Sequence, residues 1–526
     1  MNGINQQLKQ NGAIKVNKMR KYNIVKFLFK IFIIPIFLMF LTGCSGDNNR
    51  FVEYTYYKLT EDTCSVLITY KNQEEMEYYT KIDVKIPDEY NGLKVTEIDP
   101  LSYSKECIYV KNLVLGKHIY IDDLSCLNMF KHLENIKVSK QNEHYSSYKG
   151  VLYSKDKSTL LYFPLGLRIE DVKTPKNLKI LGSYSFQNKT NIHSVVIPDC
   201  IEIIDSKAFY NCEGLQRIYF TNNSRLKVIK DEAFFDCVSL VTIDMYEDSL
   251  LEEIGDYAFR NCKILEYFPR SLSLSKIGKG AFMGCTLLKK FYFNDKLTII
   301  SDEAFLDCGF ESLEFPEGIT EIGEFSFGSN LELKSVKFPE SVVEIKRGAF
   351  SNCFDLTTVY LPSNLKVLRE GVFASTAIKQ IELPKGLEKI EGYVFKGTFL
   401  KTINIPKGVT EISDYAFDEV KALESVVLPS TIKKIGKFAF HYCESLQEIN
   451  LPENVEYIGK DAFSYCMALT SITMHKNVKV IEEYAFASCT ALNEINFYGT
   501  KEDWDNIDII VPDHEILRAK VNFINK

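Results

Sequence analysis

A phenylalanine returns in register along most of this 526-residue chain, at intervals of 22 to 25 residues. A single frame surrounds it, L-x-x-I-x-L-P-x-x-V-x-x-I-G-x-x-A-F-x-x-C, best seen over residues 446–466. A fixed period of this size is the signature of a solenoid, because one coil cannot bury its own apolar face and must stack on its neighbours. We therefore expect one long solenoid with caps, rather than the three or four domains that the length alone suggests. The fourteen phenylalanines are Phe186, Phe209, Phe234, Phe259, Phe282, Phe305, Phe327, Phe350, Phe373, Phe395, Phe417, Phe440, Phe463 and Phe486.

The parts of the frame predict the path of one coil. Ile449 and Leu451 alternate with polar residues, as in a short half-buried strand, so successive coils should align these strands in one parallel sheet. The proline that follows ends the strand ladder, and the V-x-x-I segment begins a second buried edge. In A-F-x-x-C, Phe463 and Cys466 are three residues apart, which places both on the inner side of a helical turn.

Several coils depart from the frame. Coils before Phe186 are degenerate, with Tyr103 and Cys126 where phenylalanine is expected. In the coil that begins at Leu265, Pro269 stands within the strand and Arg270 stands at an apolar core position. We expect a local bulge there.

The recurring I-P, I-G and A-F-x-x-C elements resemble the BspA-like class of leucine-rich repeat proteins over residues 82–523. The resemblance implies an α/β solenoid whose right-handed coils carry a parallel sheet on one face and short helical or 3-10 turns on the other, after a β-rich N-terminal cap. It also implies a protein exported to the cell surface, with roles in adhesion and protein recognition, and no defined ligand. Two further stretches look like the same class: an inserted hairpin over residues 148–164 and a closing segment over residues 499–504.

The N-terminus reads as an export signal. Residues 31–41 are an apolar run too short to span about 30 Å of hydrocarbon, and it is preceded by Arg20, Lys21, Lys26 and Lys30. The run ends in L-T-G-C, which resembles the lipobox of bacterial lipoproteins and makes Cys44 the expected lipidation site. An uncleaved membrane anchor over residues 24–43 is the alternative, and translation could begin at Met19.

These features divide the chain into expected segments. They are an export signal (1–43), a lipid-anchored tether (44–50), a β-rich cap with the first degenerate coil (51–100), degenerate repeats with a hairpin insertion (101–185), regular repeats (186–498) and a C-terminal cap (499–526).

Nine of the fourteen cysteines occupy one frame position, three residues after the phenylalanine. Where this position lacks cysteine it holds Asn330, Thr376, Thr398 or Val420. Because valine cannot replace sulfur chemistry but can fill a small buried slot, we interpret the cysteines as packing residues. Disulfides or metal binding are the alternatives in an oxidising compartment.

The sequence shows no enzyme constellation. The seven histidines share no metal-ligand spacing, and no phosphate loop, nucleophile elbow or calcium loop occurs. We therefore expect no enzymatic activity, no metal and no cofactor. The net charge of −7 offers no excess of cations for a phosphate backbone, so we expect no nucleic-acid partner.

The outward strand residues form the candidate binding face. Tyrosine and arginine are the types most enriched at binding hot spots, although tyrosine also favours strands for its β-propensity and cross-strand stacking. The C-terminal half of this face carries glutamate and asparagine instead, such as Glu448 and Asn450. The candidate ligand-binding residues are Arg217, Tyr219, Tyr267, Lys290, Tyr292, Lys337 and Tyr360.

Three functions fit these patterns. The first is a monomeric, lipid-anchored surface protein that binds protein or glycan ligands, such as host matrix or surface proteins, in adhesion or host interaction. The second is a self-associating structural component of the envelope. The lone Trp504 and its charged neighbours argue against this function, because they look like a cap that would stop one solenoid from stacking on another. The third is an enzyme or inhibitor with its site in residues 101–180, where no motif supports it.

Overall fold

The computed structural model describes residues 52–70, 82–99, 110–168, 174–246, 249–510 and 514–524. The expected export signal, the tether and Cys44 lie outside these residues. The chain divides into two compact units, residues 1–144 and 145–526, and each is described by itself.

The first unit consists of strands, with one short 3-10 helix, η3, in its described part. One sheet has the order β1-β2-β5-β4, in which β2 and β5 are parallel and the two outer pairs are antiparallel. A second sheet joins β3, β6 and β7 in parallel. The bounds are β1 Val52–Lys58, β2 Thr63–Tyr70, β3 Ile82–Lys85, β4 Glu89–Tyr90, β5 Leu93–Ile98, β6 Val110–Leu115, η3 Leu124–Met129 and β7 Asn135–Val138.

The second unit opens with an antiparallel hairpin. Strand β8 (Tyr145–Tyr148) pairs with β9 (Val151–Ser154) across a turn at Lys149 and Gly150, whose φ angles are 50° and 85°. Strand β10 (Thr159–Tyr162) continues antiparallel to β9 and then pairs in parallel with β11 (Ile180–Leu181), the first strand of the coils.

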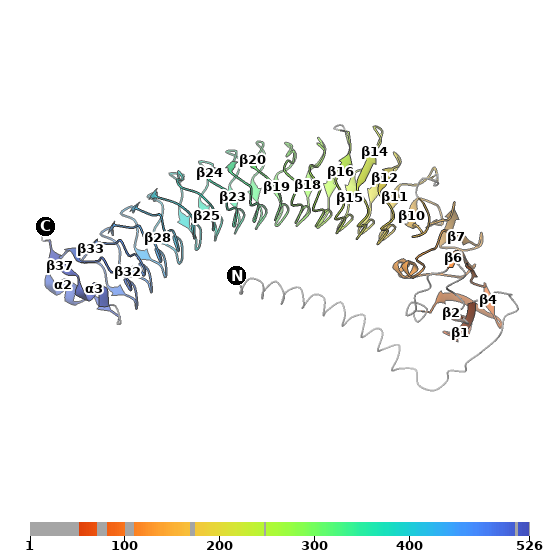
Figure 1. Cartoon of the computed structure of the whole chain (residues 1–526), viewed down its shortest axis with the longest axis horizontal. Helices are drawn as coiled ribbons and strands as arrows, with labels where there is room; N and C mark the ends of the chain where they lie inside the picture. Colours follow the sequence, from red (N-terminus) through yellow and green to blue (C-terminus); the bar gives the residue numbers. More distant parts are fainter. Residues whose placement is uncertain are drawn as a thin grey trace. The chain divides into compact units, whose positions relative to one another are not determined.

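The regular coils build two parallel ladders, where the sequence predicted one parallel sheet (Figure 1). The first ladder, here called the strand face, comes from the L-x-x-I-x-L segment. The V-x-x-I segment is also extended, and its last two residues pair with the next coil, which gives a second ladder. The strand face comprises β12 Ser194–Ile197, β14 Arg217–Phe220, β16 Thr242–Asp244, β20 Ser312–Glu314, β22 Ser335–Lys337, β24 Thr358–Tyr360, β27 Thr402–Asn404, β29 Ser425–Val427, β31 Glu448–Asn450, β33 Ser471–His475, β35 Glu494–Tyr498 and β37 Lys520–Phe523.

The strands of the second ladder are two residues long. They are β11, β13 Ile203–Ile204, β15 Val228–Ile229, β17 Glu253–Ile254, β18 Lys276–Ile277, β19 Ile299–Ile300, β21 Glu321–Ile322, β23 Glu344–Ile345, β25 Val367–Leu368, β26 Lys389–Ile390, β28 Glu411–Ile412, β30 Lys434–Ile435, β32 Tyr457–Ile458, β34 Val480–Ile481 and β36 Asp508–Ile509. A close approach explains the glycine after this segment, since a Cβ on Gly459 would lie 2.7 Å from the carbonyl carbon of Gly436 in the preceding coil.

The third side of the coils, here called the turn face, has no helix in the described coils, so the expected helical turn is wrong. Two residues with positive φ flank each phenylalanine, such as Lys207 (61°) and Asn211 (57°) around Phe209. They bend the chain through two successive turns, in which every second N–H group points toward the next coil. Phe209 N donates to Ala233 O, and Asn211 N donates to the next coil in the same way, each at 2.7 Å. A helix would have used these donors within its own segment.

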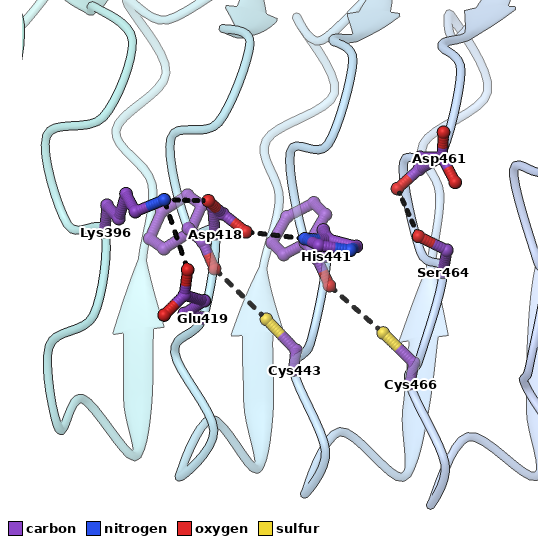
Figure 2. A network of polar contacts seen from close by, with 10 residues as sticks. Lys396, Asp418, Glu419, His441, Cys443, Asp461, Ser464 and Cys466 are labelled. Atoms are coloured by element: carbon purple, nitrogen blue, oxygen red, sulfur yellow. Dashed lines mark hydrogen bonds and ion pairs between the residues drawn. The ribbon is translucent and has the colours of Figure 1, made fainter. Parts of the chain in front are cut away.

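The phenylalanines form a continuous stack in the core. Neighbouring ring centroids lie 4.6 to 6.5 Å apart with interplanar angles of at most 25°, and Phe163 extends the stack by one ring. All nine frame cysteines are buried, as predicted. The structure adds that each Sγ donates to the carbonyl of the phenylalanine in the preceding coil, as Cys466 does to Phe440 at 3.2 Å (Figure 2). Cysteine therefore adds a hydrogen bond in a slot that Val420 fills by packing alone.

The C-terminal segment continues both ladders and adds two short helices, α2 (Lys501–Asp505) and α3 (His514–Arg518). Thr500 and Asp503 form a capping box at the start of α2. The Trp504 ring packs edge-on against the Phe497 ring, with the ring centroids 5.3 Å apart. The Glu515 carboxylate accepts a hydrogen bond from Ser488 N at 3.3 Å. Within the described residues, no helix combines the length and the apolar character needed to cross a membrane.

Candidate binding face

All seven predicted ligand-binding residues lie on the strand face, but they form three groups rather than one patch. Arg217 and Tyr219 belong to β14. A second group joins Tyr267, Lys290 and Tyr292, and a third joins Lys337 of β22 to Tyr360 of β24. Between the groups, the intervening strands carry Thr242 and Asp244 on β16, and Ser312 and Glu314 on β20.

The two side chains of the first group contact each other. Arg217 Nη1 donates to the Tyr219 hydroxyl at 3.5 Å, and this hydrogen bond raises the pKa of the guanidinium. Val196 of β12 pairs with Tyr219 and is 62% exposed, so an apolar side chain borders this group.

The second group is built on the irregular coil predicted from Pro269. Here the ladder is reduced to an isolated parallel bridge between Tyr267 and Lys290, which agrees with the expected local irregularity. Arg270, which stands at a core position of the frame, is exposed. Its guanidinium lies 4.0 Å from the centroid of the Tyr292 ring, and Nη2 donates to the Tyr292 hydroxyl at 2.7 Å.

The core compensates for the missing apolar side chain with aromatic and polar contacts. The ring centroids of Phe268 and Phe291 are 5.7 Å apart, and those of Phe291 and Phe293 are 5.1 Å apart. Ser271, which stands at the usual proline position, donates to Leu251 O at 3.0 Å, and Asn294 Nδ2 donates to Ser271 O at 2.7 Å. Burial of these polar groups is tolerated because they are hydrogen-bonded.

The third group is the most exposed. Tyr360 is 60% exposed and lies beside Lys337, whose ammonium is 3.4 Å from the Glu314 carboxylate. An ion pair between side chains this exposed contributes little to stability.

A polar network lies on the turn face, in residues that directly follow the stacked phenylalanines (Figure 2). The Asp418 side chain is 3% exposed and contacts two neighbouring coils, Lys396 Nζ at 2.6 Å and His441 Nδ1 at 2.7 Å. Burial opposes the charge on Lys396, but the hydrogen bond and charge of Asp418 raise its pKa. Ser464 occupies the corresponding position of the next coil, and its hydroxyl donates to Asp461 O at 3.1 Å. The aspartate, histidine and serine therefore form no catalytic relay.

A cavity of about 400 Å³ opens between the second ladder and the turn face. Two stacked rings, Tyr393 and Tyr415, lie 4.6 Å apart on one side, and the carboxylate of Glu391 is held by Arg369 at 3.3 Å and Lys389 at 3.5 Å. The lining residues are Glu370, Lys389, Glu391, Gly392, Tyr393, Glu411, Ser413, Asp414, Tyr415 and Lys434. The described residues contain no group of three histidine, cysteine, aspartate or glutamate side chains able to hold a metal ion.

Sequence comparison identifies the family. A family model described as "BspA type Leucine rich repeat region (6 copies)" matches residues 162–289, 220–327, 298–423 and 410–506, which together cover about two thirds of the chain. The chain belongs to the BspA-type leucine-rich repeat family. The resemblance inferred from the repeat frame is thereby confirmed, and so is a solenoid of parallel strands.

Solved structures of bacterial leucine-rich repeat proteins resemble this BspA-type chain. A leucine-rich repeat protein from Bacteroides ovatus is 24% identical, with a TM-score of 0.53 over 72% of this chain and 97% of that one. A leucine-rich cell surface protein from Faecalibacterium prausnitzii is 21% identical, with a TM-score of 0.41 over 88% of this chain and 97% of that one. No curated protein matches the chain. The first likeness supports the fold.

Two residues of this BspA-type chain make contacts that the sequence did not predict. Arg270 was recognised as a break in the frame, but not as a partner of Tyr292. Lys189 stands three residues after Phe186, in the slot that later coils fill with cysteine, and is 1% exposed. Its ammonium donates to the carbonyls of Pro164, Leu165 and Leu167 at 2.8 to 2.9 Å.

Proposed function

We propose that this BspA-type protein is a non-enzymatic surface protein that binds proteins or glycans through its strand face, in adhesion or host interaction. The observation that carries the proposal is the exposed set of tyrosine and basic side chains in the N-terminal half of that face, which includes Tyr267, Tyr292 and Tyr360. Exposed aromatic and arginine side chains are the types that dominate binding energy at interfaces.

Export and anchoring at Cys44 belong to the same proposal. Their support is the short apolar run after basic residues and the L-T-G-C sequence. Metabolic labelling with palmitate tests the anchor: wild type should carry the label and Cys44→Ser should not. Equal labelling of both would contradict lipidation at this residue.

A capture experiment tests recognition by the strand face. The purified protein is immobilised and exposed to extracellular matrix proteins and host surface proteins. One variant removes each group, namely Arg217→Ala/Tyr219→Ala, Tyr267→Ala/Tyr292→Ala and Lys337→Ala/Tyr360→Ala. Tyr484→Ala is the matched control, because Tyr484 is 38% exposed and lies on the turn face. Capture that survives in all three group variants would contradict recognition through this face.

The alternative is a self-associating structural component of the envelope. Its support is the solenoid architecture, in which each coil repeats the hydrogen-bonding pattern of the coil before it. Sedimentation of the purified protein separates the two functions. The proposed recognition protein should remain a monomer at all concentrations, whereas a structural component should sediment faster as its concentration rises.

A further inference from the structure

The coil that begins at Leu265 breaks the frame that its neighbours keep. Pro269 stands at a frame position that faces outward in the regular coils but is buried here, and Arg270 stands at a position that holds an apolar residue in the surrounding coils but is exposed here. The result is a strand face held at this coil by the single bridge between Tyr267 and Lys290. Natural sequences break such local rules mainly at functional sites, where the lost stability serves another purpose.

The break gathers unusual side chains on one part of the strand face. Six tyrosines are at least 36% exposed among the described residues, and two of them, Tyr267 at 43% and Tyr292 at 42%, come from two successive coils here. Arg270 stacks on one of these rings and donates to its hydroxyl. We call this set the Tyr-Arg cluster, and its members are Tyr267, Arg270, Lys290 and Tyr292.

We infer that the Tyr-Arg cluster binds an acidic glycan, that is, a sugar chain carrying carboxylate or sulfate groups. The inference rests on the proposed function and names the ligand class of this part of the face. Exposed tyrosine rings offer flat apolar faces with a polar edge, which suits the C–H faces and hydroxyls of a sugar. Arg270 and Lys290 add positive charge and N–H donors, which favour carboxylate and sulfate groups.

Size and surroundings favour a glycan over a protein at this cluster. The two coils of the cluster lie about 4.8 Å apart, whereas a stable protein interface needs about 800 Å² on each side with an apolar centre. The strand face next to the cluster is polar or acidic, with Thr242 and Asp244 on one side and Ser312 and Glu314 on the other. Because Asp244 and Glu314 are negatively charged, the positive charge on this part of the strand face is confined to the Tyr-Arg cluster.

Calorimetric titration of the full purified protein tests the inference with three polymers. Heparin carries sulfate and carboxylate groups, polygalacturonate carries carboxylates without sulfate, and dextran is neutral. We expect heparin, polygalacturonate or both to bind, with an affinity that falls as salt rises, and we expect no heat from dextran. Binding of one acidic polymer alone would identify the charged group that the cluster recognises.

Arg270→Leu is the sharpest variant because it restores the residue type that the frame requires at this position. We expect it to weaken binding at least tenfold while its melting temperature stays at or above that of wild type. Tyr267→Ala/Tyr292→Ala should weaken binding to a similar extent. Tyr484→Ala and Lys434→Gln, an exposed tyrosine and an exposed lysine outside the strand face, are the controls and should bind as wild type does.

Three outcomes would overturn the inference: no binding of either acidic polymer, equal binding of dextran, or an equal loss of affinity in the controls. Protein capture is measured on the same variants. If the acidic polymers fail to bind but the strand-face variants still lose protein capture, the proposed function stands and the glycan assignment is rejected.

Discussion

Phe350 shows what one residue contributes to the solenoid. Its ring is fully buried and stacks between Phe327 at 5.5 Å and Phe373 at 6.1 Å. Removal of such a ring leaves a cavity and costs roughly 3 to 5 kcal/mol. We expect Phe350→Ala to lower the free energy of unfolding by that amount, measured by denaturant titration. A loss below about 1 kcal/mol would show that the ring does not support the core.

Lys189 makes the stability of the second unit depend on pH. Burial lowers the pKa of this ammonium to about 7, well below its ordinary value of 10.5. Between these values the unfolded chain binds the proton and the folded chain releases it, so the free energy of unfolding rises with pH. Below about pH 7 both states are protonated and this contribution is flat.

The comparison of wild type with Lys189→Met isolates that effect. We expect the stability of wild type to gain on the order of 2 kcal/mol relative to the variant between pH 7 and pH 9, measured by denaturant unfolding. The three carbonyl acceptors around the ammonium favour its charged form and reduce the gain. A constant difference at all pH values would show that Lys189 stays charged when folded.

At the scale of the element, the cysteine ladder behaves as a set of buried donors. Burial raises the pKa of Cys212 and Cys353 to about 12, so thiolate is scarce at neutral pH. We expect the ladder thiols to react slowly with a thiol reagent in the folded protein and rapidly in denaturant. Neighbouring ladder cysteines found bridged by mass spectrometry would contradict this account.

The coils around Phe373 and Phe395 form a weaker element within the ladder. Their rings are 6.5 Å apart, the widest spacing in the stack, and Thr376 and Thr398 each donate to the phenylalanine carbonyl of their own coil rather than to the preceding one. The strand face is also interrupted between β24 and β27. We expect hydrogen exchange to be faster in residues 364–405 than in residues 440–486. Uniform protection of both segments would show that the thiol bonds add nothing.

The sequence was sufficient to predict the elements whose residue types repeat. The alternation of Ile449 and Leu451, the phenylalanine stack and the buried cysteine slot followed from periodicity. The turn face did not, because its positive φ angles fall on residues such as Lys207 and Tyr415, which give no glycine signal. Residue type also could not show that Arg270 turns outward, since that depends on Phe268, Phe291 and Phe293 filling the core beneath it.

At the scale of the whole molecule, the number of coils is adjustable because each coil bonds to the same positions of the next. Deletion of residues 447–469 removes 23 residues and joins equivalent frame positions, so we expect a folded protein with the strand content of wild type apart from one coil. Circular dichroism and thermal melting check this. Deletion of residues 447–457 breaks the frame and is the control, which should unfold the coils around it.

The turn face also gives the solenoid a direction. Its N–H groups point toward the next coil throughout the regular repeats, from Lys207 and Phe209 to Asp461 and Phe463, so the two ends of the stack are chemically different. Two copies could therefore extend each other only head to tail, through a heterologous contact that generates an open filament instead of a closed dimer. Glu515 stands where such a filament would grow, because its carboxylate already accepts from Ser488 N in the last coil. A single carboxylate thus occupies a position that an incoming copy would need for polymerisation.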